Sequence, residues 1–244
     1  MLGHEASGLS HDAEYIAEIA LKVMKQIGVH RFICVVSDST GNTKKARELL
    51  GKETQGIVIG LADAPHHLNL TLKDICAIKY FAGTISNSRL LLRYFNISSF
   101  GTQRLQSQAQ ADGVTRGLES IGKTRFASIN RAGVSILRNL PSIKALVNDN
   151  VDRQTYLFLR SNSQYNAYHS TLSQLVGILS PFAKAQKCLE SVHVHPGHVL
   201  LFWLAALATL QDLIDNNAET LELPQPVLDQ VVAIIDQRFD EMFS

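Results

Sequence analysis

The spacing of apolar residues predicts an amphipathic helix near the start of the chain. Over residues 12–27, apolar side chains recur every three or four positions, which is the period of one helix face. Asp12 precedes this pattern as a candidate N-cap, and Gly28 follows it where helices commonly end. We therefore expect one helix with one buried face.

Two short apolar runs after this helix predict a small α/β unit. The run 32–36 (FICVV) is continuously apolar and β-rich, which indicates a strand covered on both faces and hence a parallel one. A second run, 57–59, lies between two glycines, and residues 42–50 have the pattern of a helix. Residues 31–60 are thus predicted to form a βαβ unit.

After about residue 65 the apolar spacing is that of helices. The predicted fold class is an α/β start followed by a mainly α-helical region. We place a partial α/β subdomain at 1–95 and a helical region at 96–244. Linkers are expected where polar, glycine or proline residues gather, at 96–115, 148–154, 191–198 and 216–226.

The composition is that of an ordinary globular protein, with 45% hydrophobic and 18% charged residues. The three cysteines are dispersed, which favours buried thiols in a reducing compartment over a disulfide framework. The longest apolar stretch, 199–210, has about a dozen residues, fewer than the roughly 20 that span a bilayer. We expect a core helix there, no membrane partner, and a nuclear or cytoplasmic location.

A net charge of +1 conceals two oppositely charged segments. Residues 101–144 carry seven basic and two acidic side chains, a net charge of +5. Residues 201–244 carry one basic and eight acidic side chains, a net charge of −7. Because phosphate contacts need accumulated lysine and arginine, a nucleic acid would bind the middle of the chain. Solvated helix faces are the alternative interpretation.

Asp38 lies where open α/β sheets place their ligands, between the end of a buried strand and the start of a helix. One interpretation is that Asp38 and its neighbours only cap the helix. A second follows from residues 39–43 (STGNT), which resemble the phosphate-binding loop of flavodoxins. That resemblance implies a flavin or phosphate ligand, but the Asp38 carboxylate would repel a phosphate beside it.

A third interpretation draws on more of the chain, because several short motifs follow one another in series. Those carrying the resemblance are Asp38 with Asn42, 66–70 (HHLNL), 73–75 (KDI), 124–128 (TRFAS), 177–182 (GILSPF), 188–190 (CLE) and 238–240 (RFD). In order and approximate spacing they resemble the hAT-superfamily DNA transposases, from about Ser10 to the C-terminus. The resemblance implies a ribonuclease H-like core with a helical insertion.

In that family three acidic residues hold two divalent metals, Mg²⁺ or Mn²⁺, for phosphodiester hydrolysis and strand transfer. Asp38 looks like the second of the three, the first lying upstream of the matched region and the third after the insertion. Asn42, Asp63, His66 and Asn69 fall on family-signature positions, with Asp63 where the family has the cysteine of Cys-x-x-His. The resemblance thus implies a truncated sheet with one of three metal ligands, which would not hold a metal tightly.

Lys123 and Arg125 are the candidate DNA contacts, with a surface salt bridge as the alternative for Arg125. Taken together, these features predict a transposon-derived protein that is not an active nuclease alone. Its expected partners are DNA and either a second copy or a longer transposase chain. A non-catalytic DNA- or protein-interaction module is the alternative, and a flavodoxin-like binder is a third.

Overall fold

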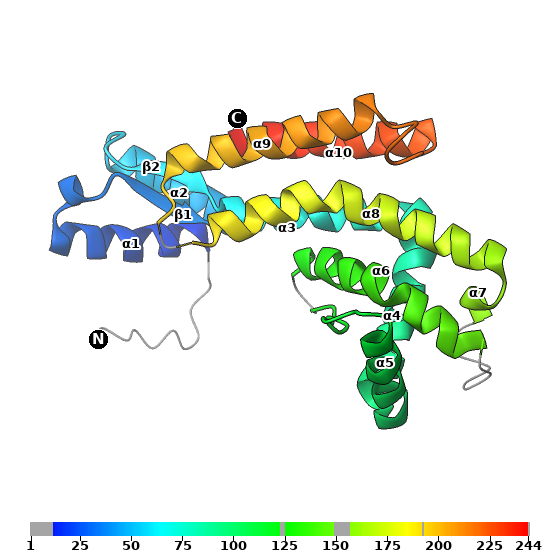
Figure 1. Cartoon of the computed structure of the whole chain (residues 1–244). Coiled ribbons are helices and arrows are strands. Elements are labelled where there is room, and N and C mark those ends of the chain that lie inside the picture. Colours follow the sequence, from blue (N-terminus) through cyan, green and yellow to red (C-terminus); the bar gives the residue numbers. More distant parts are fainter. Residues whose placement is uncertain (1–11, 123–124, 149–156, 192, 244) are drawn as a thin grey trace. The chain divides into compact units, whose positions relative to one another are not determined.

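The computed structural model of the chain describes residues 12–122, 125–148, 157–191 and 193–243. The chain divides into two compact units, residues 1–67 and 68–244, whose elements are shown in Figure 1. The coarse fold class is confirmed, because a small α/β unit precedes a mainly helical region. The domain boundary expected after residue 95 falls in the last turn of helix α4 (Lys79–Ile97) and stays a prediction.

The first unit begins with the predicted helix α1 (Ala13–Ile27). Its N-cap is Asp12, whose carboxylate accepts a hydrogen bond of 2.8 Å from the N–H of Tyr15. The helix ends at Gly28, whose φ of 105° is a conformation that residues with a Cβ rarely adopt. The remaining elements are a 3₁₀ helix (Val29–Arg31), β1 (Cys34–Ser37), α2 (Gly41–Glu53), β2 (Ile59–Ala62) and the start of α3 (Ala64–Ala77).

The predicted βαβ unit is confirmed. Strands β1 and β2 pair in parallel, from Cys34 opposite Ile59 to Ser37 opposite Ala62. Each strand begins two residues later than the apolar pattern predicts, because the 3₁₀ helix precedes β1 and a turn with a positive φ at Gln55 and Gly56 precedes β2. Both strands end where a polar loop or helix begins, which places Asp38 and Asp63 at the same end of the sheet.

The expectation that β1 is covered on both faces is wrong. Val35 packs against the core that α1 and α2 share, whereas Val36 and Ile59 are each 56% exposed. Side chains alternate between the two faces of a strand, and helices α1 and α2 contribute to one core on one face only. The buried residues of that core are Ala13, Ala17, Met24, Ala46, Leu50 and Val58.

The second unit is helical in all the regular elements that the structure describes. After the remainder of α3 and after α4 come α5 (Ser99–Ala111), α6 (Ala127–Asn148), α7 (Leu157–Arg160), α8 (Asn162–Leu189), α9 (Pro196–Asp215) and α10 (Gln225–Phe243). Its main core draws on α4 to α8. The most deeply buried members are Leu91, Ile136, Leu140, Ile143, Leu159 and Leu172.

The linker expected at 96–115 is wrong for most of its length, because helix α5 occupies it. The hydroxyl of Ser98 caps α5 by accepting a hydrogen bond of 3.0 Å from the N–H of Gly101. Leu105 and Ala109, four residues apart, are buried on one side of the helix. The segment is mostly polar, but these two buried residues form a narrow apolar stripe. Such a stripe is enough to pack a helix against a core.

The core helix expected over 199–210 lies in α9 but is buried only in part. Trp203, Ala206 and Leu210 are buried, whereas Leu201 and Leu204 are 62% and 47% exposed. By length and composition alone, α9 is the one helix in the described part of the chain that could cross a membrane. Apolar residues thus lie on two faces of α9, and only one of these faces is buried in the second unit.

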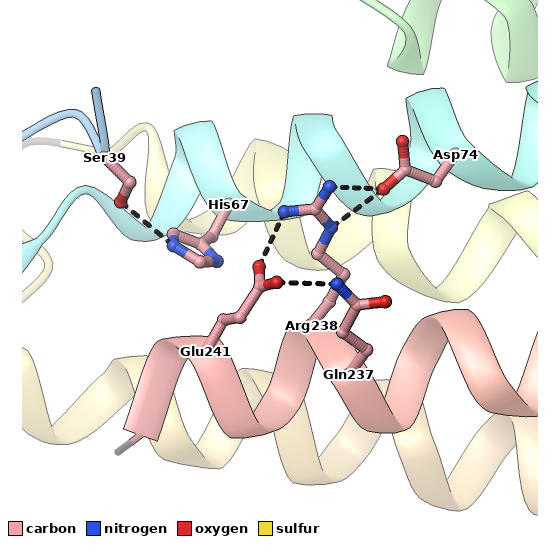
Figure 2. Close-up of polar contacts among 6 residues, drawn as sticks. All are labelled: Ser39, His67, Asp74, Gln237, Arg238 and Glu241. Atoms are coloured by element: carbon pink, nitrogen blue, oxygen red, sulfur yellow. Dashed lines mark hydrogen bonds and ion pairs between the residues drawn. The ribbon is translucent and has the colours of Figure 1, made fainter. Parts of the chain in front are cut away.

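Helix α10 is fastened to α3 by the guanidinium of Arg238. Its Nε donates a hydrogen bond of 2.8 Å to Asp74 Oδ2, and its Nη2 donates to the same oxygen. Its Nη1 donates to Glu241 Oε2 at 2.6 Å, as Figure 2 shows. Because the Arg238 side chain is mostly buried, these charge-assisted bonds compensate its desolvation.

The three cysteines are free thiols. Cys34 and Cys76 are partly buried, and burial raises the pKa of the Cys76 thiol to about 12. The expectation of a buried thiol is wrong for Cys188, which is exposed near the end of α8. Cys188 is therefore the most exposed of the three thiols.

Helices α6 and α8 approach so closely that one position between them requires glycine. A Cβ added to Gly133 would lie 2.6 Å from Val176 Cγ2. We expect Gly133→Ala to lower the free energy of unfolding by about 1–3 kcal/mol, because the core must open to admit the methyl group. Urea denaturation followed by circular dichroism measures the change.

Gly83 in α4 is the matched control, because no atom lies within 4 Å of the position of its missing Cβ. Gly83→Ala should raise the free energy of unfolding by about 0.5–1 kcal/mol through helix propensity alone. Trimming the contact, with Val176→Ala in the Gly133→Ala background, should recover part of the loss. Equal effects of the two alanine substitutions would contradict the close approach.

Candidate functional site

Asp38 directly follows β1, and its carboxylate turns toward the first turn of α2. Its Oδ1 atom lies 2.6 Å from the hydroxyl of Thr43 and 3.2 Å from that of Thr40. Thr43 Oγ1 also lies 2.8 Å from the backbone oxygen of Asp38 and 2.8 Å from Thr40 Oγ1. A hydroxyl has one proton to donate, and a carboxylate is the strongest acceptor among these groups. The Asp38 carboxylate is thus held beside the first turn of α2 by threonine hydroxyls, while the N-cap of α2 is Thr40.

The same contacts keep Asp38 ionised. The hydrogen bond from the Thr43 hydroxyl lowers the pKa of the Asp38 carboxyl most, and burial opposes it. The backbone N–H and hydroxyl of Thr40 and the charge of His66 lower this pKa further. Hydrogen bonds to the charged form of an acid stabilise that form. The carboxyl end of β1 therefore carries a fixed negative charge at neutral pH.

Arg47 of α2 holds the backbone at this strand end. Its side chain reaches the sheet, and the residue is only 8% exposed. Nη1 donates to the backbone oxygens of Ser37 at 2.9 Å and of Asp38 at 2.6 Å, and also to the Ser37 hydroxyl. Desolvation lowers the pKa of Arg47. The guanidinium remains charged all the same, since its pKa in water is far above neutral.

Sequence reasoning missed Arg47, although the chain contains a signal for it. Thr43, Arg47 and Leu50 are spaced by four and three residues, so they share the face of α2 that meets the sheet. An arginine on that face must find acceptors, because a buried charge without partners is strongly unfavourable. The backbone carbonyls of Ser37 and Asp38 at the end of β1 are acceptors that Arg47 reaches.

His67 contacts the loop after β1. Its Nε2 lies 3.0 Å from Ser39 Oγ, and the His67 ring is buried (Figure 2). A serine and a histidine at this distance have the spacing of a nucleophile and its base. The adjacent Asp38 carboxylate would repel an oxyanion forming at Ser39, since like charges at short range are unfavourable. The Ser39–His67 hydrogen bond is therefore better described as a structural contact between the loop after β1 and α3.

The structure brings together only some of the predicted signature residues. Asp63 follows β2, and its N–H donates to the Ser37 oxygen at 2.8 Å. His66 is close enough to Asp38 to lower its pKa. Asn42 is exposed at the second position of α2. Asn69 belongs to the second unit, where its Oδ1 accepts a hydrogen bond of 2.8 Å from the N–H of Phe126.

The donor set at the end of β1 does not fit a tightly held divalent metal. In the described part of the chain, no three His, Cys, Asp or Glu side chains gather closely enough to bind a metal ion. One oxygen of Asp38 is already hydrogen-bonded to threonine hydroxyls. Mg²⁺ and Mn²⁺ prefer several oxygen ligands, of which carboxylates are the strongest. Asp38 with His66 is too small a set.

Of the two predicted DNA contacts, Lys123 lies outside the described residues. The Arg125 side chain is 70% exposed, and its Nη1 lies 3.8 Å from Glu190 Oε2. An exposed ion pair of this length is worth little. The salt bridge expected as the alternative for Arg125 is present, and it leaves the guanidinium accessible to solvent.

Comparisons of the chain with protein-family models, with curated proteins and with solved structures find no match. The site is therefore interpreted from its own residues.

The Thr43 hydroxyl can be tested as the main cause of the low pKa of Asp38. Thr43→Val removes the hydroxyl with little change in shape, so the pKa of Asp38 should rise toward its ordinary value. Thr40→Val should raise it less. A pH titration of the Asp38 carboxyl carbon by NMR measures both changes.

The lowered pKa of Asp38 should also make the stability of the protein depend on pH. A carboxyl group with a lowered pKa stabilises the folded state above its ordinary pKa, and this contribution is lost as pH falls through the lowered value. Thr43→Val should therefore lose less stability than the unmodified protein between neutral and acid pH. Equal losses, with an unchanged pKa, would contradict the hydrogen bond.

Proposed function

We propose that this chain is a ribonuclease H-like segment derived from a hAT-superfamily transposase, which does not cleave DNA alone and binds DNA through its second unit. The observation that carries the proposal is the position of Asp38. It follows a parallel strand, precedes the crossover helix of a βαβ unit, and is succeeded by a long helical region. That is the order of elements that the motif resemblance implies for the second acidic residue.

The open edges and the exposed face of the two-stranded sheet support the proposal that this core is incomplete by itself. A two-stranded parallel sheet leaves a hydrogen-bonding edge on the outer side of each strand. Its face is also apolar and exposed at Val36 and Ile59. Parallel sheets are normally covered on both faces, so this face is one that further chain would cover. A longer transposase chain is the proposed source.

The chemistry of the intact family requires more acids than this chain brings together. Two-metal catalysis uses several converging carboxylates to hold both ions beside the attacking and leaving oxygens. Asp38 is one, and the charge of His66 also acts on it. In an assembled site Asp38 would hold Mg²⁺ or Mn²⁺, which would activate the attacking oxygen there. Alone, the segment orients one ligand and performs no hydrolysis.

The DNA-binding part of the proposal rests on the basic segment 101–144 of the second unit. Arg125 is well exposed and its ion pair with Glu190 is long, so a phosphate can replace Glu190 as its partner. A DNA-binding module with no link to catalysis is the alternative that this observation supports. The expected location is the nucleus or cytoplasm in either case.

A flavin or phosphate ligand has less support. The hydroxyls of Thr40 and Thr43, which would surround a phosphate, are hydrogen-bonded to the Asp38 carboxylate. A phosphate bound to these two hydroxyls would lie beside the negatively charged Asp38 carboxylate, which would repel it.

The first test is nuclease activity. We expect purified chain to leave supercoiled plasmid intact in Mg²⁺ or Mn²⁺, because one acid cannot hold two metals. Agarose gel electrophoresis detects nicking. Metal-dependent cleavage that Asp38→Asn abolishes would refute the incomplete site, whereas cleavage that survives Asp38→Asn would reveal a contaminating nuclease.

The second test is DNA affinity as a function of salt concentration. Fluorescence anisotropy with a duplex should show binding that weakens with salt, and Arg125→Ala should reduce the slope of log K against log salt by about 1. Glu190→Gln is the matched control, because it breaks the same ion pair but keeps the cation. It should bind DNA as tightly as the unmodified chain or more tightly, since a competing carboxylate is gone.

If the ion pair only holds the structure together, Arg125→Ala and Glu190→Gln should both weaken DNA binding. Binding that does not respond to salt, or no binding at low salt, would refute the DNA-binding proposal.

A further inference from the structure

Helix α9 has one face that is firmly packed. Trp203 is fully buried, and its ring meets those of Phe182, Phe239 and Phe243 edge to face at centroid distances of 6.1, 6.0 and 6.3 Å. This aromatic cluster joins α9 to α8 and α10, which lie along it in Figure 1. The orientation of α9 about its own axis is therefore fixed within the second unit.

The opposite face of α9 presents an exposed stripe with the spacing of a helix-pairing seam. Its positions alternate by four and three residues, as in a heptad pattern. In order they are Gly197, Leu201, Leu204, Ala208, Gln211 and Asp215, and all six are exposed. The middle of the stripe is apolar and its ends are polar. A contiguous exposed apolar stripe of this kind marks an interaction surface.

The two ends of α9 differ electrostatically, because the helix dipole makes the N-terminal end positive and acidic side chains lie at the C-terminal end. His195 and His198 lie at the N-terminal end with their rings stacked at 3.7 Å, next to the positive end of the helix dipole. Asp212 and Asp215 lie in the last turn, with no basic residue there. Acidic side chains at a helix C-terminus are unfavourably placed against the dipole. They gain a partner if the N-terminal end of another α9 lies beside them.

The sizes of the stripe residues also match in an antiparallel pair. With a two-fold axis beside Leu204, the two Leu204 side chains meet at the centre. Leu201 then lies over Ala208 of the second copy, and Gly197 over Gln211, so that a large side chain faces a small one on either side of the central leucine pair. Such a contact uses the same patch on both copies and closes on itself.

We propose that this chain forms a homodimer in which the exposed stripe of α9 pairs antiparallel with α9 of a second copy. A second copy fits better than a bilayer, because the apolar middle of the stripe is short and polar Gln211 and Asp215 continue it on the same face. A parallel pair would place Asp212 and Asp215 of both copies together, which like-charge repulsion disfavours. The inference does not depend on DNA binding or on the transposase resemblance.

The oligomeric state of the full chain tests the surface. Sedimentation velocity over a range of concentrations should show a monomer–dimer equilibrium. Leu204→Lys should raise the dissociation constant by at least about tenfold, since it places a charge at the centre of the contact. Ile97→Lys is the matched control, because Ile97 is an equally large exposed apolar residue at the end of α4. It should leave the equilibrium unchanged.

Circular dichroism and thermal unfolding test whether the Leu204→Lys chain is folded, which we expect because Leu204 is exposed. A monomer at every concentration refutes the proposal, and so does an equal response to both substitutions. Flotation with phosphatidylcholine and phosphatidylglycerol vesicles tests whether the stripe binds a lipid surface. Binding to vesicles that Leu204→Lys abolishes, with no dimer in solution, would assign the stripe to a lipid surface instead.

Cross-linking tests the orientation in a Cys188→Ser background, which removes the exposed native thiol. Leu204→Cys should form a disulfide-linked dimer on mild oxidation, whereas Leu201→Cys alone should not. A mixture of Leu201→Cys and Ala208→Cys chains should cross-link to each other. Cross-linking of Leu201→Cys to itself would refute the antiparallel arrangement.

Discussion

The buried guanidinium of Arg47 holds the carboxyl end of β1 in place. Arg47 Nη1 donates to the backbone oxygens of Ser37 and Asp38, and the Ser37 oxygen also accepts from the N–H of Asp63. Because a buried cation needs acceptors, Arg47 ties α2 to the end of β1. The direction of the Asp38 side chain depends on that arrangement.

The fixed strand end explains why this site is polar yet limited in chemistry. Thr40 and Thr43 hold the Asp38 carboxylate as an anion, and His67 ties Ser39 to α3. The Asp38 carboxylate and the hydroxyls of Ser39, Thr40 and Thr43 thus all have hydrogen-bond partners within the first unit. The arrangement presents one oriented carboxylate, which suits a part of a larger metal site better than a complete catalytic centre.

Both compact units leave apolar surface uncovered, and each does so for the same physical reason. A strand and a helix have two sides, while the described part of each unit packs only one of them. Val36 and Ile59 are left exposed on the sheet, and Leu201 and Leu204 on α9. These are the two faces to which we assign further contacts, additional chain on the sheet and a second copy on α9.

The sequence alone determined the local elements whose signals are short-range. Asp12 and Gly28 bound α1, and the two apolar runs with a helix between them predicted the βαβ unit, because caps and periodicity act within one element. It also placed Asp38 at the end of a strand. Tertiary structure alone decided which faces are buried, that α5 fills the polar segment after residue 97, and that Arg47 binds the strand end. These features depend on which distant residues come into contact, and that information is not present in the spacing of any single segment.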